Sequence, residues 1–334
     1  KLVYNYLDSL ENEIISKYRG ELLKTLYIGG GTPSCLNLSQ LEKLFSITNK
    51  FNLDNDYEFT IELNISDITK EKLLLIKENR VNRLSIGIET INDKFFTLIN
   101  RYNNKKDIIE KIDLCKKYFT NINIDLMYAF PGEVMKDLEK DLDFFRKLDV
   151  NHISIYSLIL EKNTKLYIDK VEPISDILES NMYYYIIDYL TNIGYNHYEI
   201  SNFSKVGYES LHNLNYWNNE YYYGFGLGAS GYIDDLRYSN TRSINNYILG
   251  KYLLESDYID KKTKMEEELI CGLRKTNGIS KKRFRDKFEC DIRDVFDIDS
   301  LINKNELIEE EDKIYIPHDK LYISNNILVN FILD

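Results

Sequence analysis

The chain has 334 residues and a net charge of −11, and hydrophobic residues make up 43% of it. This length suits one large domain with a smaller one, and the acidic balance argues against nucleic-acid binding, which needs clustered lysine and arginine. No apolar run approaches the roughly 18 residues of a membrane helix, so we expect no integral membrane segment.

The cysteines are scattered and form neither a CxxC nor a CxxxCxxC spacing. They are Cys35, Cys115, Cys271 and Cys290. Distant cysteines in a chain that opens without a signal-peptide pattern are typical of reduced thiols. We therefore expect a cytoplasmic protein.

The first half of the chain alternates β-rich runs with helical runs. We expect strands over residues 25–28, 58–63, 83–88, 121–127 and 152–158. We expect helices over 2–18, 38–49, 69–78, 93–99, 105–118 and 134–148. Repeated strand–helix order is typical of a parallel sheet, so the sequence predicts an α/β fold with a partial (β/α)6 barrel. A strand before the leading helix would complete a sixth unit, so the first strand is expected to be missing.

After about residue 164 this rhythm changes. Residues 175–193 predict one long helix, whereas 195–235 are rich in glycine, asparagine and aromatic residues without a clear period. Helices are then expected over 265–273 and 280–288, a hairpin within 306–316 and a closing helix over 321–333. The sequence thus predicts a barrel over 1–170, an extension over 171–258 and a small winged-helix-like α+β domain over 259–334.

Candidate ligand-binding residues follow the expected strands, where barrels of this kind build their active sites. Glycines occupy positions 29–31, and the missing Cβ atoms let backbone amides approach a ligand closely. Glu62, Glu89 and Asp125 lie at or near the next three strand ends, and Arg101 follows a short helix. Each has an ordinary explanation as a turn or surface residue, but Asp125 lies in an apolar strand, where a carboxylate needs partners. Together they suit a zwitterionic ligand with an amine, a carboxylate and ribose hydroxyls.

Several segments resemble the radical S-adenosylmethionine (SAM) core of the oxygen-independent coproporphyrinogen oxidase group. They are residues 25–36 (TLYIGGGTPSCL), 80–89 (RVNRLSIGIE), 121–132 (NINIDLMYAFPG) and 152–158 (HISIYSL). Residues 198–203 (YEISNF) and 212–217 (HNLNYW) are similar to the signature of its HemW branch, and 266–274 (EEELICGLR) resembles the start of its C-terminal domain. The order of these segments along the chain and the spacing between them make the resemblance specific.

The resemblance implies two cofactors, SAM and a [4Fe-4S] cluster held by three cysteines of a CxxxCxxC loop. The SAM-contacting positions that it implies are Gly30, Gly31, Thr32, Glu62, Arg101 and Asp125. Glu89 stands where the family usually has glutamine beside the ribose, and an ionised carboxylate cannot donate a hydrogen bond there.

The sequence departs most from the family in having no CxxxCxxC loop. We therefore expect that this chain by itself neither assembles the cluster nor cleaves SAM. Either the segment with the cysteines has been lost from in front of Lys1, or the chain is a degenerate homologue. The retained SAM-side residues favour the first explanation.

His212 opens the HNLNYW segment and is the candidate ligand for heme iron, because histidine is a common axial ligand and the resemblance implies heme binding. Alternatively, His212 and Trp217 tie a loop to the barrel. Residues 226–231 fit GxGxxG, but they follow no clear strand–helix unit, so close backbone packing is expected rather than dinucleotide binding.

Three functions stay open from the sequence. The first is a HemW-type chaperone that binds heme and passes it to acceptor proteins. The second is an oxygen-independent oxidase that acts on a porphyrinogen, coproporphyrinogen III. The third is a degenerate module that binds SAM or heme without radical chemistry.

Overall fold

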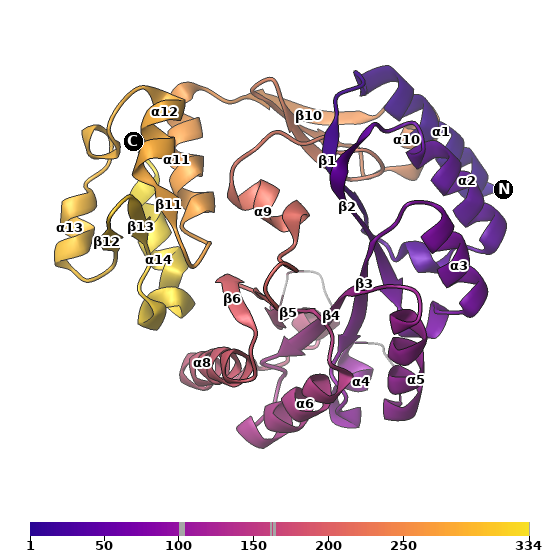
Figure 1. Cartoon of the computed structure of the whole chain (residues 1–334), viewed down its shortest axis with the longest axis horizontal. Helices are drawn as coiled ribbons and strands as arrows, with labels where there is room; N and C mark the ends of the chain where they lie inside the picture. The colour runs from indigo at the N-terminus through magenta and orange to yellow at the C-terminus, as the bar shows by residue number, and fades with distance from the viewer. Residues whose placement is uncertain (100–103, 161, 163–164, 334) are drawn as a thin grey trace. The chain divides into compact units, whose positions relative to one another are not determined.

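The computed structural model describes residues 1–99, 104–160, 162 and 165–333 (Figure 1). The contacts divide the chain into two compact units, which are described separately. The first comprises Lys1–Leu26, Leu36–Tyr57 and Leu211–Asp334, and the second comprises Tyr27–Cys35 and Glu58–Ser210.

A curled seven-stranded sheet with the strand order β1-β2-β3-β4-β5-β7-β6 dominates the fold (Figure 1). Its strands are β1 (Leu23–Ile28), β2 (Leu53–Asn64), β3 (Arg83–Glu89), β4 (Asn121–Tyr128), β5 (His152–Ser157), β6 (Asn196–Glu199) and β7 (Asn202–Ser204). Strands β2 to β5 pair in parallel, and β7 joins β5 in the antiparallel sense. This confirms the predicted α/β fold with a partial barrel.

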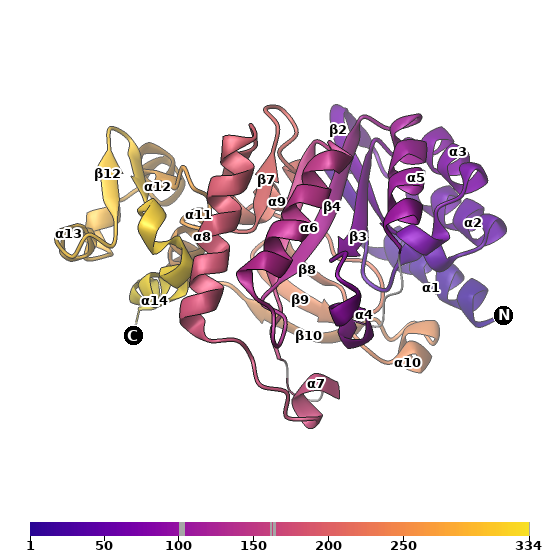
Figure 2. The same ribbon diagram turned by 90° about the horizontal axis from the view of Figure 1, so that it is seen from below.

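Helices of the second unit cover one face of this sheet (Figure 2). They include α3 (Lys70–Glu78), α5 (Lys105–Lys116), α6 (Met135–Leu148) and α8 (Asp176–Asn192), and the unit also contains α4 (Asp93–Ile99) and α7 (Lys165–Ile168). Side chains alternate between the two faces of a strand, so Leu84 and Ile86 of β3 are buried on the covered face, whereas Arg83 and Ser85 belong to the other. The face opposite the helices therefore carries the polar side chains.

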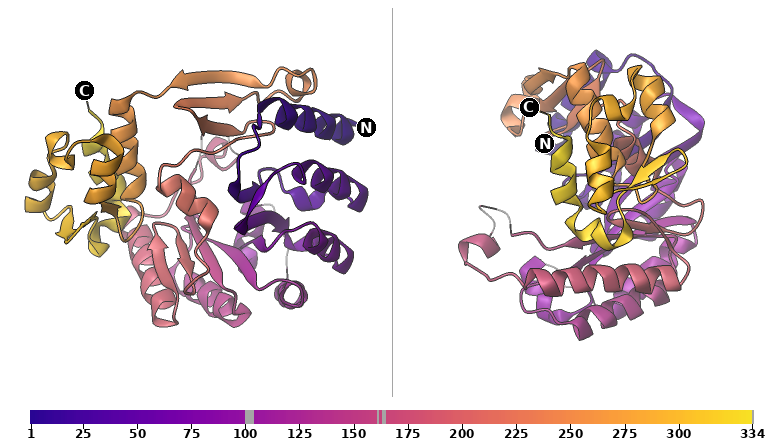
Figure 3. Two further views of the ribbon diagram at one scale, coloured as in Figure 1. Left: turned by 45° about the horizontal axis from the view of Figure 1, so that its top comes forward. Right: turned by 90° about the vertical axis from the view of Figure 1, so that its left-hand side faces the viewer.

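The first unit combines helices with two small antiparallel sheets (Figure 3). Near its start lie α1 (Leu2–Lys17) and α2 (Leu38–Thr48). They are followed by α9 (Leu211–Trp217), β8 (Ser230–Ile233), β9 (Leu236–Asn240), α10 (Ile244–Ile248) and β10 (Leu253–Tyr258). The end of the chain forms the predicted winged-helix-like module. It contains α11 (Lys261–Gly272), β11 (Ile279–Ser280), α12 (Lys281–Phe288), α13 (Ile298–Asn303), β12 (Ile308–Glu310), β13 (Lys313–Tyr315) and α14 (Ser324–Leu328).

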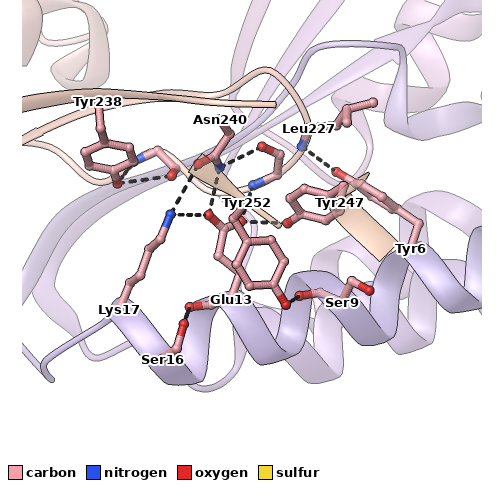
Figure 4. Close-up of polar contacts among 12 residues, drawn as sticks. Tyr6, Ser9, Glu13, Ser16, Lys17, Leu227, Tyr238, Asn240, Tyr247 and Tyr252 are labelled. Atoms are coloured by element: carbon pink, nitrogen blue, oxygen red, sulfur yellow. Dashed lines mark hydrogen bonds and ion pairs between the residues drawn. The ribbon is translucent and has the colours of Figure 1, made fainter. Parts of the chain in front are cut away.

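A buried carboxylate anchors α1 within this unit (Figure 4). Oε1 of Glu13 accepts hydrogen bonds from Lys17 Nζ at 2.6 Å and Asn240 Nδ2 at 2.7 Å. Oε2 accepts from the amide of Gly226 at 2.9 Å and the hydroxyl of Tyr247 at 2.6 Å. Burying a charge is costly unless it is paired and hydrogen-bonded, and four donors meet that requirement.

The single helix predicted over 321–333 is wrong. That stretch contains the end of a 3₁₀-helix (His318–Ile323), then α14, then a second 3₁₀-helix (Val329–Phe331). The buried residues Leu321, Ser324, Ile327 and Phe331 are mostly three apart, which suits the three residues per turn of a 3₁₀-helix. Among the described residues, none of the helices has the length and hydropathy needed to cross a membrane.

Candidate ligand-binding site on the polar face of the sheet

A turn of consecutive left-handed residues follows β1. The φ angles are 71° at Gly30, 92° at Gly31 and 58° at Thr32. A Cβ atom added to Gly30 or Gly31 would have no neighbour within 4 Å. These glycines therefore border open space, and their backbone is accessible to a ligand.

Glu62 at the end of β2 holds this turn in place. Its Oε2 accepts a hydrogen bond from the amide of Gly30 at 3.0 Å, and its Oε1 accepts one from the hydroxyl of Tyr27 at 2.8 Å. Burial and the nearby carboxylate both raise the pKa of Tyr27, so this hydroxyl stays protonated and keeps donating. The structure thus joins two of the predicted site residues, with Glu62 supporting the glycine turn.

Asp125 lies half-buried on β4, and its pKa is raised to about 7. Desolvation is the largest cause; the charges of Glu89 and Glu62 raise the pKa further, while the hydrogen bond from Asn123 and the charge of Arg83 lower it. These interactions place three predicted carboxylates within electrostatic reach of one another. A cation bound among them would lower the pKa and favour the ionised form.

Glu89 ends β3 with a left-handed backbone, φ 64°, at a shift in the register between β3 and β4. The shift pairs Gly87 with Asp125 and Glu89 with Leu126. Arg101, the remaining predicted site residue of this group, lies outside the described residues.

Sequence reasoning missed a set of buried polar residues behind Asp125. Asn123 Nδ2 donates to Asp125 Oδ1 at 2.8 Å and to Ser85 Oγ at 2.9 Å, and Asn123 Oδ1 lies 2.6 Å from Nδ1 of His152. The signal in the sequence is the alternation N-I-N-I-D over residues 121–125, in which every second residue is polar. In a strand covered by helices on one face, that alternation places the polar residues on the other.

His212 belongs to α9 in the first unit and is half-buried. Its Nδ1 lies 2.9 Å from Thr25 Oγ1 and its Nε2 lies 3.1 Å from the hydroxyl of Tyr216. The first contact orients the ring, as the partners of metal-binding histidines do. Binding iron through Nε2 would require replacement of the Tyr216 contact.

The described residues contain no group of three or more His, Cys, Asp or Glu side chains placed to hold a metal ion. All four cysteines are free, and Cys115 is buried. These thiols do not fit an iron–sulfur cluster, which needs three of them together.

The glycine-rich segment 226–231 is packed against protein. The Gly226 amide is bonded to Glu13, and a Cβ atom at Gly231 would overlap the ring of Tyr238. This agrees with close backbone packing at this segment.

Known proteins share both the sequence and the fold of this chain. Residues 4–145 match the Radical SAM superfamily, and residues 259–316 match the HemN C-terminal domain. The chain is 37% identical to the protein called "Heme chaperone HemW" of Lactococcus lactis, over 98% of this chain and 89% of the relative. It is 36% identical to the protein of the same name in Bacillus subtilis, over 99% and 92%.

Among solved structures, the coproporphyrinogen III oxidase (HemN) of Escherichia coli is similar to this chain with a TM-score of 0.86. The match covers 98% of this chain and 83% of the oxidase at 21% sequence identity. A likeness at this identity shows the shared fold, with no bearing on the reaction.

Proposed function

This chain belongs to the HemW family of radical SAM proteins, and on that premise we propose that it is a heme chaperone. The observation that carries the proposal is the identity of 37% with a HemW heme chaperone over 98% of the chain. The half-buried His212 on α9 supports it, since imidazole is a common ligand of heme iron. The oxidase likeness is one of fold, so porphyrinogen oxidation is not proposed.

The glycine turn and the three carboxylates of the second unit, Glu62, Glu89 and Asp125, suit the binding of a SAM molecule. The turn leaves open space beside Gly30 and Gly31 for the ligand, and the three acidic side chains offer acceptors to an amine and to ribose hydroxyls. In radical SAM proteins the cluster provides an open iron that chelates SAM and the electron that cleaves it. We propose that Glu62 supports the turn and that Asp125 faces the cationic ligand.

For heme, we propose that His212 Nε2 is the iron ligand. Thr25 Oγ1 would fix the opposite ring nitrogen, and the hydroxyl of Tyr216 would be displaced from Nε2. This arrangement makes Thr25 a positioning residue, since it acts on the iron through the imidazole. The acceptors would be proteins that take heme from this site, and free thiols suit a cytoplasmic location.

Hemin titration followed by the Soret absorbance tests the heme site. We expect His212→Ala to weaken hemin binding by about tenfold or more, because one coordinate bond is lost. His318→Ala is the matched control, since His318 is an exposed histidine in the same unit, and it should bind hemin like the parent. Equal hemin affinity of the parent and His212→Ala would remove His212 from the site.

A further inference from the structure

A continuous line of hydrogen bonds within the second unit connects Asp125 to the residue that precedes α9. Asn123 Nδ2 donates to Asp125 Oδ1 at 2.8 Å, and Asn123 Oδ1 lies 2.6 Å from His152 Nδ1. His152 Nε2 lies 2.7 Å from the hydroxyl of Tyr198, which accepts from the amide of Ser210 at 3.2 Å. These five residues are called the polar relay below.

The orientation of the Asn123 amide sets the direction of each hydrogen bond from Asp125 to Tyr198. Asn123 Oδ1 can only accept, so His152 Nδ1 carries the proton and Nε2 is the acceptor for the Tyr198 hydroxyl. Ser154 Oγ donates to the same Asn123 oxygen at 3.0 Å. Burial and the charge of Arg83 lower the pKa of His152 well below its usual value. The ring is therefore neutral and carries a proton on only one of its two nitrogens.

The relay has a second arrangement in which the directions between Asp125, Asn123, His152 and Tyr198 are reversed, while the Ser210 amide still donates to Tyr198. If Asp125 donates instead of accepting, the Asn123 amide turns over and offers its NH₂ group to His152. The imidazole then carries its proton on Nε2, and the hydroxyl of Tyr198 can no longer donate to it. Two discrete arrangements of one buried network are the kind of element through which distant sites influence each other.

Ser210 is the last residue of the relay and is fully buried. Its amide is bonded to Tyr198, and its Oγ donates to Glu58 Oε1 at 3.1 Å. Helix α9 begins at the next residue, Leu211, and carries His212 one residue further on. The direction of the Tyr198 hydroxyl therefore acts on the backbone at the start of the helix that holds the candidate heme ligand.

We propose that the polar relay couples ligand occupancy at Asp125 to the start of α9 and so to heme binding by His212. The proposal rests on the proposed function, which assigns Asp125 to the SAM side and His212 to heme. A cation beside Asp125 keeps it ionised against the charges of Glu62 and Glu89 and holds the relay in the arrangement described. Binding at either end then changes affinity at the other by the same factor.

A double-mutant cycle tests the coupling without added SAM. Asp125→Asn replaces the ionised acceptor, and Tyr198→Phe interrupts the relay by removing one hydroxyl. We expect Asp125→Asn to change the hemin affinity by about fivefold or more, and to change it much less in the Tyr198→Phe background. Tyr195→Phe is the control background, because the Tyr195 hydroxyl donates to Val150 O at 2.6 Å outside the relay. In the Tyr195→Phe background, Asp125→Asn should change the hemin affinity as much as it does in the parent.

Two further measurements separate this inference from the proposed function. Hydrogen exchange of a peptide over residues 209–217 should rise in Asp125→Asn, whether or not His212 binds heme. The chain has four histidines, so ¹⁵N spectra of labelled histidine can be assigned by substitution, and His152 should show a protonated Nδ1. A protonated Nε2 in the parent, or equal exchange in the parent and Asp125→Asn, would overturn the relay. Hemin binding that does not depend on His212 would overturn the proposed heme site alone.

Discussion

Two glycine-rich segments of this protein differ in what surrounds their glycines. At residues 29–31 of the second unit, Gly30 and Gly31 border open space. At residues 224–231 of the first unit, a Cβ atom on Gly224 would overlap the backbone carbonyl of Ser230, and one on Gly231 would overlap the ring of Tyr238. Packing of the protein therefore requires glycine at Gly224 and Gly231, whereas Gly30 and Gly31 leave the space that we propose for the ligand.

The two segments also share one arrangement, in which a carboxylate accepts hydrogen bonds from a glycine amide and a tyrosine hydroxyl. Glu62 does this for Gly30 and Tyr27, and Glu13 does it for Gly226 and Tyr247. Glu13 is fully buried and has two further donors, whereas Glu62 is half-buried beside the open turn. Substitutions in the two segments should therefore affect different properties.

The largest effect is expected from Gly224→Ala. The new methyl group would overlap the backbone of Ser230, which cannot change rotamer as a side chain can. The free energy of unfolding should therefore fall by about 3 kcal/mol or more. Urea denaturation would measure it. Gly250→Ala is the control, since no atom lies within 4 Å of its Cβ position and only the strain of a positive φ, about 1 kcal/mol, applies. Equal losses in both variants would contradict the packing argument.

A smaller loss of stability is expected from Glu13→Gln. An amide nitrogen would face two of the four donors whose hydrogen bonds the carboxylate now accepts, so the free energy of unfolding should fall by about 2 kcal/mol. Glu11→Gln on the same helix is the control. Glu11 forms surface ion pairs with Lys43 and Lys50, which contribute about 1 kcal/mol at most. Thermal unfolding curves that shift equally for both would show that the buried network adds nothing.

The smallest effect on stability, but a large one on the ligand, is expected from Gly31→Val. The side chain would occupy the open space beside the turn and reduce SAM affinity by about tenfold or more, as measured by calorimetry. Gly194→Val carries a similar backbone strain, with φ 96° against 92°, and should leave SAM binding unchanged. If both variants weakened SAM binding alike, backbone strain rather than the ligand would explain the loss.

The sequence predicts the alternating part of this fold well, because period-two apolar runs and capped helices are local signals. Strand β3 begins at Arg83 and helix α4 spans Asp93–Ile99, as expected. Strand β2, in contrast, begins at Leu53 rather than 58, because its first residues, 53–57, include Asp54, Asn55 and Asp56 and show no apolar run. Helix α9 was not predicted, because a short Asn-rich stretch has weak helix propensity and depends on its neighbours.

The candidate site likewise has one part that the sequence predicts and one part that depends on the tertiary fold. Glu62 and Asp125 could be identified because strand ends of a parallel sheet meet at one edge. The bond between His152 and Tyr198 could not, because it depends on the antiparallel β6–β7 hairpin folding back onto β5. That pairing is a property of the curled sheet rather than of any local pattern.

Three of the four partners of Glu13 lie far along the chain, and this affects how a new molecule folds during synthesis. Gly226, Asn240 and Tyr247 follow Glu13 by 213, 227 and 234 residues. At about 5–20 residues per second, a ribosome needs on the order of 10 to 50 seconds between synthesis of α1 and of these residues. During translation α1 therefore emerges before three of the four donors to its carboxylate exist, and the whole network can form only after Tyr247 has been synthesised.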